Sequence, residues 1–83
     1  MTKADIVNNL KNQMAVHYRT AINWGKYKGD KEREEKHIAR VWAIYWTGLD
    51  LLGDNYAQTL DNARVEARAT AERIHAHLDE LEK

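Results

Sequence analysis

Residues 38–52 read IARVWAIYWTGLDLL and carry apolar side chains on more than one side of the helix that they are expected to form. At 100° per residue, six of them share one sector of that helix: Ile38, Val41, Trp42, Tyr45, Leu49 and Leu52. Ile44 and Leu51 project about 120 to 140° from this sector, and Trp46 lies about 80° from it on the other flank. Since a helix of a three-helix bundle needs one apolar stripe of about 100°, this helix has more apolar surface than two neighbours within the chain are expected to cover.

The glycines divide the rest of the chain. Proline is absent and helix-favouring residues dominate, so only the four glycines interrupt the helical pattern. Gly25 and Gly29 bracket a short polar connection, and Gly53 stands where a glycine commonly follows a helix. The sequence therefore predicts three helices, at about 4–24, 31–52 and 55–81.

Cap residues and apolar stripes support these helices. Thr2 with Asp5 forms a capping-box-like pair, and Asp30 is the expected N-cap of the second helix. The first helix places its apolar residues in one sector: Ile6, Val7, Leu10, Met14, Tyr18, Ala21 and Trp24. The third has a narrow stripe with the steps of a coiled-coil seam: Tyr56, Leu60, Ala63, Ala67, Ala71, Ile74, Leu78 and Leu81. The predicted fold class is all-α, a three-helix antiparallel bundle or long helical hairpin that dimerises through the second helix and the stripe of the third.

Size and composition favour a single domain, residues 1–83, that gains stability from a partner. A domain of 83 residues buries only about 60% of the surface of its unfolded chain. Without cysteine, neither a disulfide nor a thiolate zinc site can add stability, which leaves oligomerisation. Residues 1–10 lack the pattern of a secretion signal, and residues 41–49 are shorter than the roughly 20 residues that span a bilayer. We therefore expect a cytoplasmic protein that does not cross a membrane.

The surplus apolar surface predicts a protein-binding site on the second helix. Tryptophan and tyrosine are the side chains that most often carry binding energy at interfaces. The predicted partner-binding residues are Trp42, Ile44, Tyr45, Trp46 and Leu51. The alternative is that the first and third helices bury all of these residues. The predicted function is that of a non-enzymatic protein that forms a homodimer or larger homo-oligomer and assembles, inhibits or regulates another protein, as small accessory proteins of mobile genetic elements often do.

Basic residues around the first connection support a second interpretation, a small helical nucleic-acid-binding regulator. Residues 24–29, WGKYKG, combine aromatic rings that stack on bases with lysines that hold phosphates. The candidate nucleic-acid-binding residues are Lys26, Lys28, Lys31, Arg33, Lys36 and Arg40. Two observations disfavour the nucleic-acid interpretation. The formal net charge of the chain is zero, and a helix end capped by glycine also explains residues 24–29. A helix-turn-helix is also disfavoured, because Asp54 and Asp61 precede the first basic residue of the third helix, Arg64.

Histidines and glutamates give a third interpretation, a metal-binding helical bundle. Glu34 with His37 and Glu72 with His75 have the Glu-x-x-His spacing of di-iron carboxylate bundles, but helical geometry predicts mainly solvated pairs. His17 falls in the apolar sector of the first helix, where a hydrogen-bonded, half-buried side chain is expected, with a pH-sensitive contact as the alternative. Serine and cysteine are absent, and no nucleophile with a neighbouring base or phosphate loop can be assembled. Neither an enzyme nor a cofactor is therefore predicted.

Overall fold

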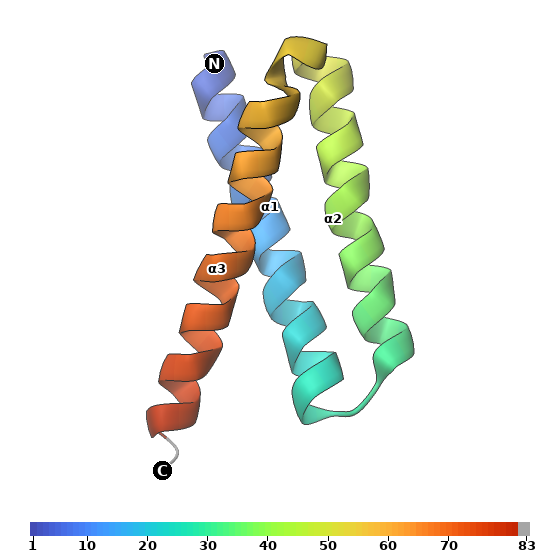
Figure 1. Ribbon diagram of the computed structural model, residues 1–83, viewed down its shortest axis with the longest axis vertical. Coiled ribbons are helices and arrows are strands. Elements are labelled where there is room, and N and C mark those ends of the chain that lie inside the picture. Colours follow the sequence, from blue (N-terminus) through green and yellow to red (C-terminus); the bar gives the residue numbers. More distant parts are fainter. Residues whose placement is uncertain (82–83) are drawn as a thin grey trace.

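The computed structural model describes residues 1–81, and all regular structure within them is helical (Figure 1). The three α-helices are α1 (Lys3–Ile22), α2 (Lys31–Leu52) and α3 (Ala57–Leu81). A π-helical turn, Asn23–Tyr27, follows α1, and a 3-10 turn, Asp54–Tyr56, precedes α3. The all-α prediction is confirmed for these residues.

The predicted caps form as the local sequence indicates. The Thr2 hydroxyl accepts a hydrogen bond from the Asp5 amide, and the Asp5 carboxylate accepts one from the Thr2 amide, each at 3.1 Å. At the start of α2, the Asp30 carboxylate accepts a hydrogen bond from the Arg33 amide at 3.1 Å. Gly53 ends α2 with a φ of 97°, which residues other than glycine rarely adopt.

The end of α1 differs from the prediction, which extended this helix to Trp24 as a regular α-helix. The α-helix ends at Ile22, and the chain widens into the π-helical turn before it reverses. Gly25 lies in this turn for a steric reason. The carboxylate of Glu34 packs directly against its backbone, so a β-carbon at this position would overlap that carboxylate. The first connection is therefore held close to α2.

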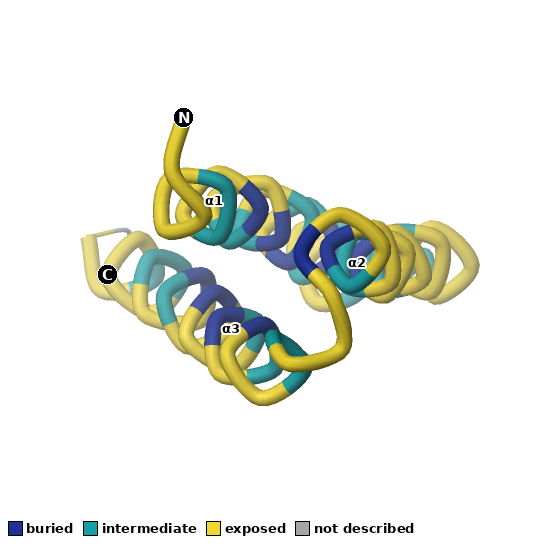
Figure 2. The backbone as a smooth tube through the Cα atoms, turned by 90° about the horizontal axis from the view of Figure 1, so that it is seen from above, coloured by how far each residue is buried: buried dark blue, intermediate teal, exposed yellow. Residues whose placement is uncertain are grey.

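The central helix of the fold is α1, which packs along both α2 and α3. Its buried residues join two clusters, to which all three helices contribute. The first cluster comprises Met14, Tyr18, Val41, Ala67 and Ala71. The second comprises Leu10, Leu52 and Leu60. Figure 2 shows that the buried positions line the sides on which the helices face each other.

In contrast, α2 and α3 lie close together only near the turn that joins them, and they diverge towards their other ends (Figures 1 and 2). Near the turn, Gly48 lets α2 approach its neighbours: a β-carbon there would lie 3.0 Å from the side chains of Leu10 and Leu60. The radius of gyration is 13.7 Å, whereas a compact chain of 83 residues has one of about 12 Å. One side of α2 is therefore left without a neighbouring helix.

The predicted stripe of α3 is only partly core. Leu60, Ala63, Ala67 and Ala71 are buried, but Leu78 is exposed, as is Leu81. Leu78 lies beside the end of α1, where it lines an open hollow with Val16, Arg19 and Asn23. The buried part packs against α1. α1 of the same chain therefore covers the buried part of the stripe, and a share of the stripe in dimerisation stays a prediction for its exposed end.

Leu60→Asp is expected to unfold the domain, because Leu60 is fully buried and its replacement would place an unpaired carboxylate in the core. The loss, on the order of 5 kcal/mol, is comparable with the total stability of about 4 to 12 kcal/mol for a chain of this length. Circular dichroism during urea unfolding measures it. Val65→Asp is the matched control, because Val65 lies on the same helix but is exposed. Equal stability of the two variants would contradict the assigned core.

Candidate protein-binding surface

Three rings on α2, those of Trp42, Tyr45 and Trp46, form a continuous aromatic ridge. Tyr45 meets Trp42 edge to face at 5.7 Å between centroids and Trp46 at 5.3 Å. Tyr45 is half-buried against both core clusters. Trp42 and Trp46, by contrast, are 41% and 61% exposed. Tyr45 therefore fixes two exposed tryptophans on the folded core.

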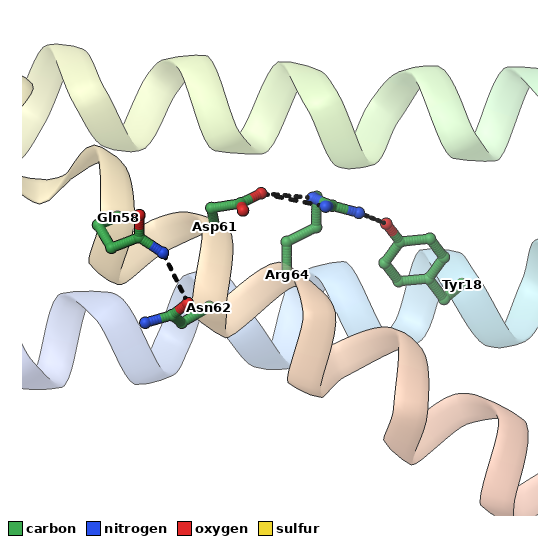
Figure 3. Close-up of polar contacts among 5 residues, drawn as sticks. All are labelled: Tyr18, Gln58, Asp61, Asn62 and Arg64. Carbon is green, nitrogen blue, oxygen red and sulfur yellow. Dashed lines mark hydrogen bonds and ion pairs between the residues drawn. The ribbon is translucent and has the colours of Figure 1, made fainter.

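A second contact fixes Trp42 from the side of α3. The guanidinium of Arg64 lies 4.6 Å from the centroid of the Trp42 ring, within the range of a cation–π interaction. Arg64 also donates a hydrogen bond to the Tyr18 hydroxyl at 3.1 Å and forms an ion pair with Asp61 at 3.0 Å (Figure 3). The hydrogen bond to Tyr18, followed by the contact with Asp61, raises the pKa of Arg64. One arginine of α3 thus links side chains from all three helices.

A groove opens beside this contact, where α2 and α3 diverge. Its apolar lining comes mainly from α1 and α2: Tyr18, Ala21, Ile22, Ile38 and Trp42. Its charged lining comes from both walls: Glu34, Arg64, Arg68 and Glu72. This part has a volume of about 380 Å³, and an adjoining hollow of about 260 Å³ shares Ile22, Glu34 and Glu72 with it. We call the two together the α2–α3 groove.

The charges along the groove are unevenly matched. Arg68 and Glu72 form an exposed ion pair at 3.1 Å on the α3 wall. Across the groove, the Glu34 carboxylate forms no ion pair within residues 1–81. An apolar floor with a few polar groups at the rim is typical of sites that bind an amphipathic helix.

The five predicted partner-binding residues do not form one surface. Ile44 packs against both core clusters. This corrects the expectation that Ile44 belongs to apolar surface of α2 that the core does not cover. Leu51 is 65% exposed, as expected, but lies five residues after Trp46 and therefore about 140° around the helix. Trp42, Tyr45 and Trp46 are brought together as the aromatic ridge.

Sequence reasoning missed several residues of this surface. Ala39 and Ala43 are exposed beside the two tryptophans. Their spacing with Trp42 and Trp46 was a signal in the sequence, because residues 39, 42, 43 and 46 follow the helical repeat. The contact of Arg64 with Trp42 had no such signal, since it depends on how α2 and α3 cross.

The predicted nucleic-acid-binding residues are partly engaged within the chain. Lys26 forms an ion pair with Asp79 at 2.8 Å, and the hydrogen bond to this carboxylate raises the pKa of Lys26. Arg33 lies 4.2 Å from the centroid of the Trp24 ring and so covers an aromatic face that a base would need. The other four candidates are exposed: Lys28, Lys31, Lys36 and Arg40.

The Glu-x-x-His pairs are not brought together as a metal centre. Glu72 is paired with Arg68, and Nε2 of His75 lies 3.1 Å from the carbonyl oxygen of Arg19. Within residues 1–81, no three histidine or carboxylate side chains gather closely enough to hold a metal ion. Glu34 and His37 also separate, since Glu34 lines the groove whereas His37 contacts α1.

The contact of His37 with α1 is a hydrogen bond to His17. The two Nδ1 atoms lie 3.2 Å apart, so one ring donates its proton and the other accepts it. Burial first, and then the charges of His37 and Arg40, lowers the pKa of His17; burial and Arg40 lower that of His37. The prediction that His17 is half-buried and hydrogen-bonded is confirmed.

Comparison with known proteins does not indicate a function for this chain. Comparison with protein-family models, with curated proteins and with solved structures gives no match. Within residues 1–81, none of the helices combines the length and the apolar character that crossing a lipid bilayer requires. A functional assignment therefore depends on the surface of the molecule itself.

The histidine pair predicts that the domain loses stability as the pH falls below about 6.5, the ordinary pKa of histidine. The pKa of each ring is lowered in the folded chain. The unfolded chain therefore binds protons first, and acid favours unfolding. Urea unfolding at pH 7.5, 6.0 and 5.0 measures the effect, which His17→Gln with His37→Gln should reduce. The exposed His77→Gln serves as control. An unchanged pH dependence in the double variant would contradict this assignment.

Proposed function

We propose that the protein acts without catalysis, by binding another protein along the aromatic ridge and the α2–α3 groove. The observation that carries this proposal is the exposure of Trp42 and Trp46, although both rings are held in place by neighbours. Exposed apolar patches rimmed by polar groups mark interaction sites, and rings that are already fixed lose little entropy on binding. Binding a partner would therefore bury two indole rings with little loss of side-chain entropy.

The shape of the groove favours a helix of the partner as its occupant. The groove lies between α2 and α3, and side chains of α1 form an apolar floor there. An amphipathic helix in this position would place its apolar side against Ile22, Ile38 and Trp42. A basic residue of that helix would face Glu34 and supply the ion pair that this carboxylate lacks within residues 1–81.

Binding of this kind is sufficient for a regulatory, inhibitory or assembly role. When the groove covers a helix of one protein, that helix can no longer bind its other partners. A molecule that holds helices from two proteins brings these two proteins together. The nucleic-acid alternative receives less support, because Lys26 and the face of Trp24 are occupied by groups of the same chain.

Trp46→Ala is expected to weaken partner binding while changing stability little, because Trp46 is 61% exposed. A tryptophan at the centre of an interface contributes about 2 kcal/mol or more, which is roughly 30-fold in affinity. Affinity capture from the native cell, with mass spectrometry, compares the wild type with the variant. Urea unfolding measures stability in parallel.

Val16→Ala is the matched control for that capture, because Val16 is similarly exposed but lies on α1, outside the groove. It should retain the same proteins as the wild type. The proposed function would be wrong if Trp46→Ala captured the same proteins in the same amounts. Equal losses of binding and stability would place Trp46 in the core instead.

A further inference from the structure

The contact of Arg64 with Trp42 combines three kinds of group. The guanidinium lies 4.6 Å from the centroid of the indole ring and pairs with the Asp61 carboxylate at 3.0 Å. A guanidinium is planar and carries its donors at its edge, so it can stack on an aromatic face and donate to a carboxylate at the same time. The aspartate lies three residues before the arginine on α3. An indole, a guanidinium and a carboxylate are thus held together.

The same grouping occurs a second time, at the start of α2. The guanidinium of Arg33 lies 4.2 Å from the centroid of the Trp24 ring. It pairs at 3.5 Å with the carboxylate of Asp30, which again lies three residues before the arginine. Two of the three tryptophans of the chain are therefore contacted by an arginine that is paired with an aspartate.

The third tryptophan, Trp46, has a neighbouring aspartate but no arginine from its own chain. Asp50 lies four residues after Trp46 on α2, so the two side chains share one side of the helix, with β-carbons about 5 to 6 Å apart. Helical side chains lean towards the N-terminus, which tilts Asp50 towards the indole. Within residues 1–81, no arginine or lysine stacks on Trp46, and Asp50 forms no ion pair. Both residues are exposed, so a cation from another molecule can reach them.

The position of Asp50 in its helix gives an independent reason to expect a cation. Asp50 lies in the last turn of α2, where the helix dipole disfavours a negative charge, and that turn contains no basic residue. Asp54 follows four residues later, and no lysine or arginine occurs between Arg40 and Arg64. A cation bound beside Asp50 is attracted both by this carboxylate and by the carbonyl end of the helix. A local cost that the fold itself does not offset is typical of a functional site.

We propose that Trp46 and Asp50 form a binding site for an arginine side chain of the partner protein. The inference rests on the proposed function, to which it adds the chemistry of the partner. The arginine stacks on the indole of Trp46 and donates to the Asp50 carboxylate, in the way that Arg64 contacts Trp42 and Asp61. Arginine is favoured over lysine, because its planar guanidinium can make both contacts at once.

Charge also restricts the class of partner. A nucleic acid presents phosphates beside its bases, and the Asp50 carboxylate repels them. A protein surface that carries an arginine next to apolar residues fits instead. Its apolar part covers the exposed indoles of Trp42 and Trp46, while the arginine meets Asp50 at the end of the aromatic ridge. Arginine is among the residues enriched at protein interfaces and at their hot spots.

Arginine and citrulline test the site, because citrulline has nearly the shape of arginine but no charge. The probes are two synthetic helical peptides with an apolar side of leucine and alanine, identical except that one carries arginine and the other citrulline. In the full chain, the NMR signals of the indole N–H groups report where each peptide binds. The arginine peptide should shift the Trp46 signal and bind about tenfold more tightly, through one exposed ion pair and one cation–π contact. Trp24, which Arg33 already contacts, is the internal control. Equal affinities, no shift of Trp46 with either peptide, or an arginine-dependent shift at Trp24 instead would each overturn the inference.

Asp50→Asn tests the carboxylate in the same titration. It should reduce the preference for arginine from about tenfold to about threefold, which the cation–π contact alone supplies, and leave the affinity for the citrulline peptide unchanged. Glu80→Gln is the matched control, because Glu80 is also exposed and forms no ion pair within the described residues. It should change neither affinity. An equal loss of both affinities in Asp50→Asn would overturn the inference, since it would show that Asp50 only supports the structure.

The two proposals fail in distinguishable ways. If the preference for arginine is absent but Trp46→Ala still loses captured proteins, the arginine site is wrong and the proposed function stands. If the preference is present but Trp46→Ala captures the same proteins as the wild type, the site binds arginine and the proposed function is wrong. Self-association of the wild type that the arginine peptide displaces would assign the arginine to a second copy and overturn the proposal of a different partner.

Discussion

The packing of α1 against both other helices is the constraint on which the rest of the structure depends. Buried alanines of α3, such as Ala67 and Ala71, let α3 approach the larger side chains of α1, while α2 packs on the other side. Both neighbours are thus held mainly by α1, and they contact each other chiefly near their connecting turn and through Arg64 and Trp42. Away from their connecting turn, α2 and α3 diverge, and the groove and the uncovered side of α2 follow from that divergence.

Polar contacts at the crossing of the helices keep this opening defined. Arg64 reaches from α3 to the Tyr18 hydroxyl on α1 and to the ring of Trp42 on α2. A partly buried guanidinium that meets an acceptor, a carboxylate and an aromatic face satisfies most of its interactions. The indole of Trp42 is therefore held at the rim of the groove and remains partly exposed.

Local features could be predicted from the sequence, and features that depend on how helices cross could not. Caps and glycines act on neighbouring residues, so the starts of α1 and α2 and the role of Gly53 followed directly. Helical periodicity identified the exposed Trp46, but it could not show that Ile44 packs against both clusters, because that depends on which helix is central. Gly48 was a missed signal, since a glycine within a helical pattern often marks close packing.

The central claim is that the aromatic side of α2 is uncovered by the chain's own fold and is reserved for another molecule. Acrylamide quenching of a variant in which Trp46 is the one indole, with Trp24→Phe and Trp42→Phe, tests this most directly across a dilution series. Strong quenching at the lowest concentration, close to that of the urea-unfolded chain, is the predicted result. An indole that stays shielded at every concentration, including the most dilute, would show that Trp46 is buried within a single chain and would contradict the account.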